Sequence, residues 1–227
     1  MNTPTAGESR ATFLSRVQRA LSAPGRSPSH HAADHTPPAT AELARLVSPQ
    51  ADLPSLFAAN SAKSGMHVHR VDKSAIVSTL SALLAQSPGA QVALAITDSV
   101  LRTLASQALQ AAGNPGITWT AQQSARVWFD VDIAITDVTA AVAETGSLVL
   151  ACSPLLPRAA FMVPPVHIAL VRTSQILPDL LDLLAGDHST PQGTLTIVSG
   201  PSKTADIEGI LVTGVHGPGQ LHVVLTP

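Results

Sequence analysis

Short segments in which nearly every residue is apolar constrain the fold of this chain more than any other feature. QVALAIT (91–97), DIAIT (132–136) and HIALV (167–171) are the clearest, and SLVLA (147–151), TLTIVS (194–199) and LHVVL (221–225) are similar. MHVHRV (66–71) also predicts a strand, although it contains two histidines and an arginine. Strands that are apolar at nearly every position are usually buried on both faces, which is typical of a parallel sheet covered by helices. No apolar run approaches the roughly 20 residues of a membrane-spanning helix, so we expect no membrane insertion.

Segments with helical periodicity alternate with these strands. DKSAIVSTLSALLAQ (72–86) and DSVLRTLASQALQAAG (98–113) each follow a strand, and Asp98 is suited to cap the second of them. SQILPDLLDLLAG (174–186) predicts a further helix, with Pro178 in its first turn, where proline is tolerated. The predicted fold class is therefore α/β, a three-layer α/β/α domain with a mostly parallel central sheet.

The N-terminal part of the chain has a different pattern. Apolar residues at helical spacing predict an amphipathic helix over residues 8–21, and residues 22–40 are rich in Pro, Ser, His and Ala, which indicates a linker. We therefore expect an N-terminal helix and flexible linker over 1–49 and the α/β domain over 50–227. The first residues contain no apolar core after basic residues, so we expect no export and a cytoplasmic location.

Charge and composition exclude several classes of function. The chain has 13 Lys and Arg against 15 Asp and Glu, without a basic patch, and its aromatic content is only 3%, so nucleic acid is not an expected partner. The single cysteine, Cys152, excludes an intramolecular disulfide and a self-contained iron–sulfur or cysteine-rich zinc site. We expect its thiol to behave as a small buried hydrophobe.

The densest polar segment is SGPSKTADIEGILVTGVHGP, residues 199–218. A strand runs into it, and we predict that a helix begins near Ala205. Gly200 allows a tight turn between the two, and free backbone N–H groups at a helix start, with Lys203 beside them, suit a phosphate or carboxylate. The side chains that could cap this helix are Ser202, Thr204 and Asp206.

Two common phosphate-binding patterns are absent from this segment. Ser202 stands where a P-loop has a glycine before its Lys-Thr pair, and no GxGxxG pattern occurs. The segment is therefore either an anion cradle or an ordinary capped turn. His216 lies next to Gly217 in a glycine and proline loop before the last strand, where it is either an acid, base or ligand contact or a structural histidine.

Other polar residues interrupt apolar sequence. AETGSLVL (143–150) places Glu144 before a turn into a strand, where the carboxylate is either a nucleophile or general base or a turn residue bonded to the backbone. Arg158 could hold a carboxylate bidentately, although an exposed arginine is the simpler interpretation. His167 opens a strand and adds a second polar group nearby.

Metal binding is not predicted. His67 and His69 share one strand face, but no third ligand is evident near them, so a solvated face is the favoured interpretation. A second group lies in the predicted linker, where adventitious binding is the most that we expect, and consists of His30, His31, Asp34 and His35. The sequence indicates no particular cofactor.

AETGSLVL, the PPVHI segment and SGPSKTADIEGILVTGVHGP followed by LHVVL, in this order across residues 130–227, resemble the LUD family. The resemblance implies a fold similar to ribose-5-phosphate isomerase, CoA transferases and 5-formyltetrahydrofolate cyclo-ligase. It also implies a role in oxidation of L-lactate to pyruvate beside two iron–sulfur partner proteins. With one cysteine, this chain cannot hold such clusters itself. CoA transferases use a glutamate nucleophile, which suggests Glu144 by analogy.

We therefore predict that residues 199–218 form a polar pocket at one end of the sheet that binds a small anionic metabolite. The groups predicted to transfer protons or attack are Glu144, Asp206 and His216. The predicted ligand-binding residues are Thr145, Gly146, Arg158, His167, Gly200, Ser202, Lys203, Thr204 and Gly217. The predicted function is a component of a lactate-oxidising system, and the alternative is a stand-alone enzyme or sensor for a phosphorylated or carboxylated metabolite.

Overall fold

The computed structural model describes most of the 227 residues, and the chain divides into two units, Met1–Ala44 and Arg45–Pro227. The described ranges are 9–22, 45–48, 50–185, 194–205 and 211–227. Most of the predicted linker, with its four candidate metal ligands, lies outside the described residues, and so does Asp206.

Helix α1 (Arg10–Leu21) is the described element of the first unit. The hydroxyl of Ser9 accepts a hydrogen bond from the Thr12 amide at 3.2 Å and so caps the helix start. The Arg16 guanidinium lies 5.4 Å from the centre of the Phe13 ring. The helix predicted over residues 8–21 is confirmed from Arg10 to Leu21.

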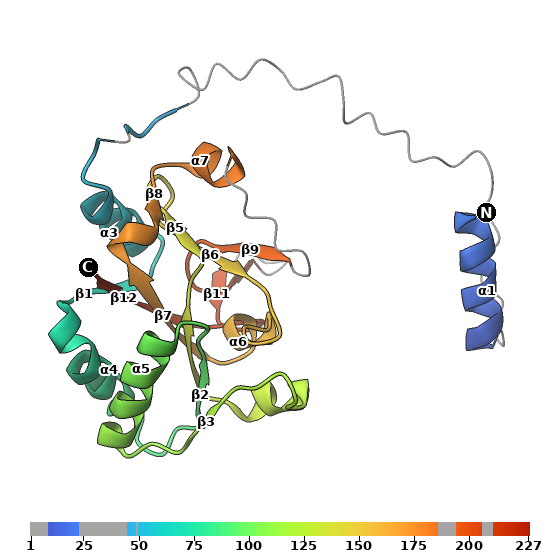
Figure 1. Ribbon diagram of the computed structural model, residues 1–227, viewed down its shortest axis with the longest axis horizontal. Coiled ribbons are helices and arrows are strands. Elements are labelled where there is room, and N and C mark those ends of the chain that lie inside the picture. The colour runs from blue at the N-terminus through green and yellow to red at the C-terminus, as the bar shows by residue number, and fades with distance from the viewer. Residues whose placement is uncertain (1–8, 23–44, 49, 186–193, 206–210) are drawn as a thin grey trace. The chain divides into compact units, whose positions relative to one another are not determined.

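A six-stranded sheet forms the centre of the second unit (Figure 1), and all its neighbouring strands are parallel. In spatial order the strands are β1 (His67–Arg70), β12 (Gln220–Thr226), β7 (Val166–Arg172), β4 (Ile133–Asp137), β2 (Val92–Ala95) and β3 (Gly116–Thr118). The inner strands β2 and β4 are buried at every position, as expected for strands covered on both faces. The predicted parallel sheet is confirmed.

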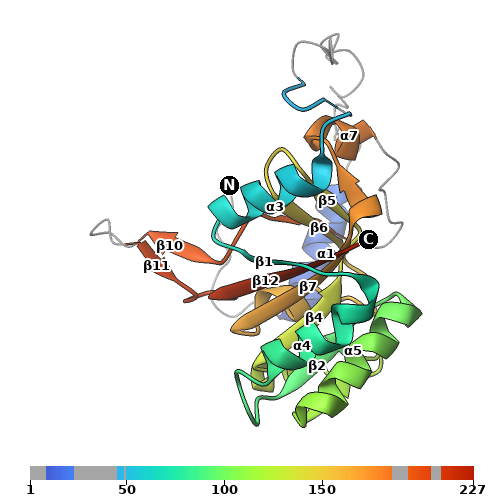
Figure 2. The ribbon, with the colours of Figure 1, turned by 90° about the vertical axis from the view of Figure 1, so that its left-hand side faces the viewer.

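Two helices cover one face of this sheet: α4 (Ile76–Leu84), which the 3-10 turn η1 (Lys73–Ala75) precedes, and α5 (Ser99–Ala112). Leu80 and Leu101 pack with Ile135 of β4 in one apolar cluster. Asp98 caps α5 by accepting the Leu101 amide at 2.9 Å, as predicted. Figure 2 shows α4 and α5 on one side of the sheet and α3 on the other.

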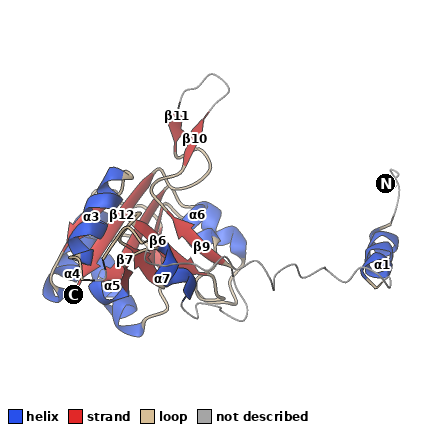
Figure 3. Ribbon diagram, turned by 90° about the horizontal axis from the view of Figure 1, so that it is seen from above, coloured by secondary structure: helices blue, strands red, loops and turns tan. Residues whose placement is uncertain are grey.

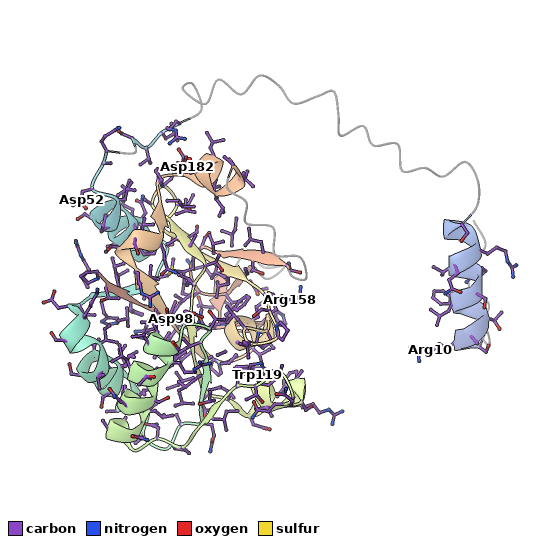
Figure 4. All side chains as sticks on the ribbon, viewed as in Figure 1. Arg10, Asp52, Asp98, Trp119, Arg158 and Asp182 are labelled. Atoms are coloured by element: carbon purple, nitrogen blue, oxygen red, sulfur yellow. The ribbon has the colours of Figure 1, made fainter. Side chains whose placement is uncertain are left out.

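The other face carries a mixed layer. Its helical parts are α3 (Leu53–Lys63), α6 (Ala159–Met162) and the 3-10 turn η2 (Ala125–Asp130), and its second sheet has the order β8 (Ile176–Leu177), β5 (Ala140–Val142), β6 (Ser147–Ala151), β9 (Leu195–Val198). Phe57, Trp128, Leu148 and Phe161 join these elements to the central sheet in the larger apolar cluster. Asp52, labelled in Figure 4, caps α3. The three-layer α/β/α architecture is confirmed, with strands added to one outer layer.

Two predicted strands lie in this second sheet rather than in the central one. β6 pairs antiparallel with β5 and with β9, so SLVLA and TLTIVS are strands but not parallel ones. β9 is only partly buried, because its apolar residues contact the core from one side while Ile197 is 44% exposed. An apolar run alone therefore did not distinguish a central strand from a covering strand.

The helix predicted over residues 174–186 is wrong in its first half. Residues Thr173–Gln175 form a 3-10 turn, Ile176 and Leu177 pair with Ala141 and Val142 as β8, and helix α7 spans Leu180–Ala185. Pro178 therefore precedes the helix, and its carbonyl accepts the Glu144 amide at 3.0 Å. Asp179 opens α7 by accepting the Asp182 amide. Long-range strand pairing overrides the local helical pattern here.

The helix predicted to begin near Ala205 is also wrong. Lys203–Ala205 (β10) pairs antiparallel with Leu211–Thr213 (β11). Thr204 faces Val212 and Lys203 faces Thr213 across the pair, and β-branched residues in such positions favour strands. Figure 3 shows this pair projecting from the body of the second unit. The helix start that was to hold an anion is replaced by a strand.

Candidate functional site

A cavity of about 260 Å³ lies between β9 and the loop that precedes β12, and we name it the loop cavity. Its polar lining comes from Thr196, Ser199, Gly200, Ser202, His216 and Gly217, and its other lining residues are Phe161, Met162, Ile197, Val198, Pro218 and Leu221. The structure thus brings four predicted residues together: Gly200, Ser202, His216 and Gly217. They lie at the amino edge of the central sheet, since they are near the start of β12.

Main-chain contacts tie the two halves of the 199–218 motif together. The Ser202 amide donates to the Pro218 carbonyl at 2.9 Å, and the Gly214 amide donates to the Ser202 carbonyl at 2.8 Å. Gly200 has φ +107°, and a Cβ there would collide with the carbonyl oxygen of Ser64 at the end of α3. This position therefore requires glycine for both its conformation and its close approach.

The loop cavity offers neutral hydrogen-bond donors. The backbone N–H groups of Gly200, His216 and Gly217 make no hydrogen bond within the described part of the chain. Successive free N–H groups in a loop can bind an anion without a cationic side chain. Lys203 is exposed and does not line this cavity; its Nζ lies 3.9 Å from where a Cβ on Gly65 would stand, beside the end of α3.

The predicted residues Glu144, Thr145 and Gly146 form the turn between β5 and β6, outside the loop cavity. The Asn60 side chain donates to the Glu144 carbonyl at 2.9 Å, and the Ser61 hydroxyl donates to the Gly146 carbonyl at 2.9 Å. Gly146 has φ +66°, and a Cβ there would collide with the Ser61 backbone. These contacts fix the main chain of the turn on α3.

A chain of hydroxyls nevertheless connects this turn with the loop cavity. Thr145 Oγ1 lies 2.7 Å from Ser147 Oγ, which lies 2.6 Å from Ser199 Oγ. Ser147 is buried, and Ser199 lines the cavity. Neither serine was among the predicted site residues, although each stands beside a glycine at a strand end, in Gly146-Ser147 and Ser199-Gly200.

His167 lies behind the loop cavity rather than in it. It is fully buried on β7, its Nε2 lies 2.9 Å from Thr136 Oγ1, and its ring is 6.3 Å from that of Phe161, a lining residue. Burial lowers the pKa of His167 to about 3, so the imidazole is neutral at physiological pH. Its Nδ1 has no hydrogen-bond partner among the described residues.

The other predicted residues are dispersed. Arg158 is exposed at the start of α6, as Figure 4 shows, and it does not line the loop cavity. Thr204 lies on β10. Cys152 is half-buried and packs against the larger apolar cluster. The structure thus divides the predicted site into a cavity group, a turn on α3 and a core histidine.

A second cavity, of about 380 Å³, lies at the carboxyl ends of β2, β4 and β7. Its lining residues are Thr97, Asp98, Asp137, Val138, Thr139, Ala151, Leu156, Arg172 and Gln175. Asp137 is 5% exposed and accepts the amides of Thr97 and Asp98, the latter at 2.9 Å. Arg172 Nη2 contacts Asp98 Oδ2 at 2.6 Å. The Leu101 amide and then Arg172 lower the pKa of Asp98, because both stabilise its carboxylate.

This second cavity lies at a topological switch point, and we name it the switch-point cavity. β2 continues into α5 on one face of the sheet, whereas its neighbour β4 continues into β5 on the other face. Ligands of open α/β sheets bind where neighbouring strands diverge in this way. This cavity was not predicted from the sequence, although Ile-Thr-Asp recurs at the carboxyl ends of two strands, at 96–98 after β2 and at 135–137 in β4.

His67 and His69 have a third histidine beside them, His222 of β12. The ring centroids of His67 and His69 lie 4.9 Å and 5.4 Å from that of His222, and His69 Nε2 is 3.1 Å from His222 Nδ1. Burial, and then the proximity of His67 and His69, lowers the pKa of His222 to about 4. Within the described ranges, no group of three or more His, Cys, Asp or Glu residues is arranged to hold a metal ion.

Comparisons with known proteins agree with the fold. A solved DUF162 family protein from Deinococcus radiodurans superposes with a TM-score of 0.56 over 77% of this chain and 96% of that one, at 18% identity, which shows the fold alone. Among the helices of the described ranges, none is long and apolar enough to span a membrane.

Sequence relatives come from several bacteria. An uncharacterized protein of Neisseria meningitidis serogroup B is 37% identical over 98 residues, which is 42% of each chain. Lactate utilization protein C of Bacillus velezensis is 32% identical over 136 residues (55% of this chain, 56% of the relative), and that of Bacillus subtilis is 29% identical over 134. The matches span about half the length of these relatives.

The match to a family as a whole is more extensive than any of these pairwise matches. The LUD domain model matches residues 55–226, from α3 to the end of β12. It therefore includes the central sheet, the second sheet, the β10–β11 pair, the loop cavity and the switch-point cavity. Because the match extends over most of the length of the chain, the chain belongs to the LUD domain family.

Proposed function

We propose that this protein is a component of a bacterial L-lactate utilization system in which iron–sulfur partner proteins carry out the oxidation of lactate to pyruvate. The observation that carries the proposal is membership of the LUD domain family together with relatives named lactate utilization protein C. Its single cysteine also cannot supply the set of thiolates that an iron–sulfur cluster needs. The electron transfer is therefore assigned to the partners.

Within this system, the loop cavity is the proposed site for a small anionic metabolite, lactate or pyruvate. Its free amides at Gly200 and Gly217 and the Ser202 hydroxyl would hold the carboxylate, and His216 would contact the group at the neighbouring carbon. Lys203 stands outside the cavity and would attract the anion from solution. The roles predicted for Glu144 and Arg158 stay predictions.

Reconstitution tests the proposal. Lactate oxidation by the iron–sulfur partners should require the full chain, and Ser202→Ala or His216→Ala should reduce the rate about tenfold or more, as expected when a hydrogen bond to a charged ligand is lost. Arg126→Ala, a change at an exposed residue of η2, is the control. Undiminished oxidation without this chain would overturn the proposal.

A second candidate function is a stand-alone enzyme, or a sensor, for a phosphorylated or carboxylated metabolite. The switch-point cavity favours it, because Asp98, Asp137 and Arg172 bring two acids and a guanidinium to the edge where α/β enzymes bind ligands. Turnover of a phosphosugar, acyl-CoA or folate by the purified chain, abolished by Asp137→Asn, would support an enzyme. Binding without turnover, with a changed affinity for a partner, would support a sensor.

A further inference from the structure

A third cavity, of about 450 Å³, lies where α4 and α5 begin. It shares Arg172 with the switch-point cavity, but neither proposed function uses its other lining residues. We name it the helix-start cavity. Its lining residues are Lys73, Ser74, Ile76, Val100, Leu101, Leu104, Arg172, Thr226 and Pro227. It is therefore bounded by the first turns of two helices and by the carboxyl ends of β7 and β12.

The walls of the helix-start cavity are largely apolar. Ile76 and Leu101 are buried members of the cluster between the sheet and its helices, Leu104 packs against that cluster, and Val100 is 63% exposed. Such walls favour a hydrocarbon group, because each buried methylene contributes about 0.8 kcal/mol. A small ligand that is polar throughout would leave this surface unused.

The charged side chains that line the cavity are both basic. Lys73 and Arg172 belong to the lining, and no Asp or Glu of the described ranges does. The Arg172 side chain uses Nη2 for Asp98, and its other N–H donors have no partner among the described residues. The starts of α4 and α5 add the positive ends of two helix dipoles. The cavity therefore favours an anionic group.

Thr226 supplies an independent observation. It is 3% exposed, it lines the cavity, and its Oγ1 has no hydrogen-bond partner among the described residues. It stands two positions after Val224 on β12, so both side chains project from the face that α4 and α5 cover. Buried hydroxyls normally have a partner. A ligand oxygen in this cavity is the neighbour that can provide one.

From this combination we infer that the helix-start cavity binds a monocarboxylate with an apolar body, such as a medium-chain fatty acid. The carboxylate contacts Arg172, Lys73 and the Thr226 hydroxyl, and the hydrocarbon lies against Ile76 and Leu104. Lactate and pyruvate have too little apolar surface to use these walls. The site is therefore separate from the loop cavity and does not depend on the lactate role.

Titration of the full chain with acetate, butanoate, hexanoate and octanoate, followed by calorimetry and ligand-observed NMR, tests this inference. The affinity should rise about fourfold for each added methylene until the cavity is full. Hexanamide, which has the same body without the charge, should bind at least tenfold more weakly than hexanoate. Inorganic phosphate should not compete with hexanoate. A flat chain-length series, or equal binding of the amide, would overturn the inference.

Variants locate the site. Arg172→Gln should weaken hexanoate about tenfold and Lys73→Gln about threefold, whereas Arg126→Gln, at an exposed arginine distant in sequence, should have no effect. Thr226→Val should weaken hexanoate without lowering stability, because it removes a hydroxyl that has no partner in the free protein. If Arg172→Gln does not fold, hexanoate binding by the Lys73 and Thr226 variants tests the site instead. Variants that match the Arg126 control would refute the site.

Discussion

The two edges of the central sheet are polar for different reasons. At the amino edge, the loop cavity is bounded by glycines, serines and main-chain amides, and its ionisable lining residue is His216. At the carboxyl edge, ionised side chains follow the strand ends, with Arg172 paired to Asp98 and Asp137 buried beside them. The site at the amino edge therefore depends on backbone conformation, and the site at the carboxyl edge depends on interactions between charged side chains. Each edge should therefore respond to a different kind of change.

The largest effect is expected from Gly200→Ala at the amino edge. The new Cβ would collide with the Ser64 carbonyl at a residue whose φ is +107°, so both strain and overpacking apply, and we expect a loss of about 2–4 kcal/mol in the free energy of unfolding. Urea denaturation measures it. Gly89→Ala is the matched control, because φ there is +80° but nothing lies within 4 Å of the new Cβ. Equal losses of stability in the two variants would show that the contact between the new Cβ and the Ser64 carbonyl contributes nothing.

Acid should destabilise the amino edge through His167. Its folded pKa of about 3 lies below the ordinary value of 6.5, so the unfolded chain binds a proton first as the pH falls. The stability that the neutral, buried ring allows is complete above pH 6.5 and is lost toward pH 3, by about 1.4 kcal/mol per pH unit. Comparison of unfolding curves at several pH values with those of His167→Gln isolates this slope. A slope unchanged in the variant would contradict the assignment.

The carboxyl edge should respond in a lower pH range. The pKa of Asp98 is lowered below its ordinary value of 3.8, so its contribution is present above that value and is lost as the pH falls through the folded pKa. The two edges are thus expected to lose stability in successive pH windows. In urea denaturation at several pH values, Asp98→Asn should remove the loss of stability in the lower pH window and leave the loss in the higher window unchanged.

A smaller loss of stability is expected from Asp137→Asn at the carboxyl edge. The carboxylate accepts hydrogen bonds from the amides of Thr97 and Asp98 and from the Thr97 hydroxyl. The NH₂ group of an asparagine cannot accept, so at least one of these hydrogen bonds would be lost. We expect a loss of about 1–3 kcal/mol in the free energy of unfolding, measured by urea denaturation. Asp130→Asn, at an exposed position, should change it by less than about 0.5 kcal/mol.

The amino-acid pattern predicted the centre of the molecule better than its margins. β2, β4, β7 and β12 were predictable because burial on both faces leaves an apolar run. β3 and β5 have three residues each, which is too short for a periodic signal, and both were missed. Pairing of Ile176 with Ala141, far away in the chain, replaces the helix predicted there, whereas Thr204 pairs with Val212 in the segment that follows it.

The candidate site was predictable to a similar extent. Gly200 and His216 line one cavity, as predicted from the concentration of glycine, proline and polar residues in 199–218. Glu144 could not be placed, because its turn is fixed by Asn60 of α3, which no local pattern connects to it. Asp137 and Arg172 required the strand order, since only the topology makes their strand ends neighbours.

The smallest change in stability is expected from Lys203→Ala, and it separates charge from shape at the amino edge. The lysine is exposed, so we expect the free energy of unfolding to change by less than about 0.5 kcal/mol. If Lys203 attracts the anion while neutral amides hold it, the variant should slow association of pyruvate at low salt, and the difference should vanish at high salt. Stopped-flow binding at several salt concentrations measures this, with Lys73→Ala, a change at an exposed lysine of η1 at the opposite edge of the sheet, as the control. A salt-independent loss of affinity would instead mean that Lys203 contacts the ligand directly, and the amino edge would then depend on charge as the carboxyl edge does.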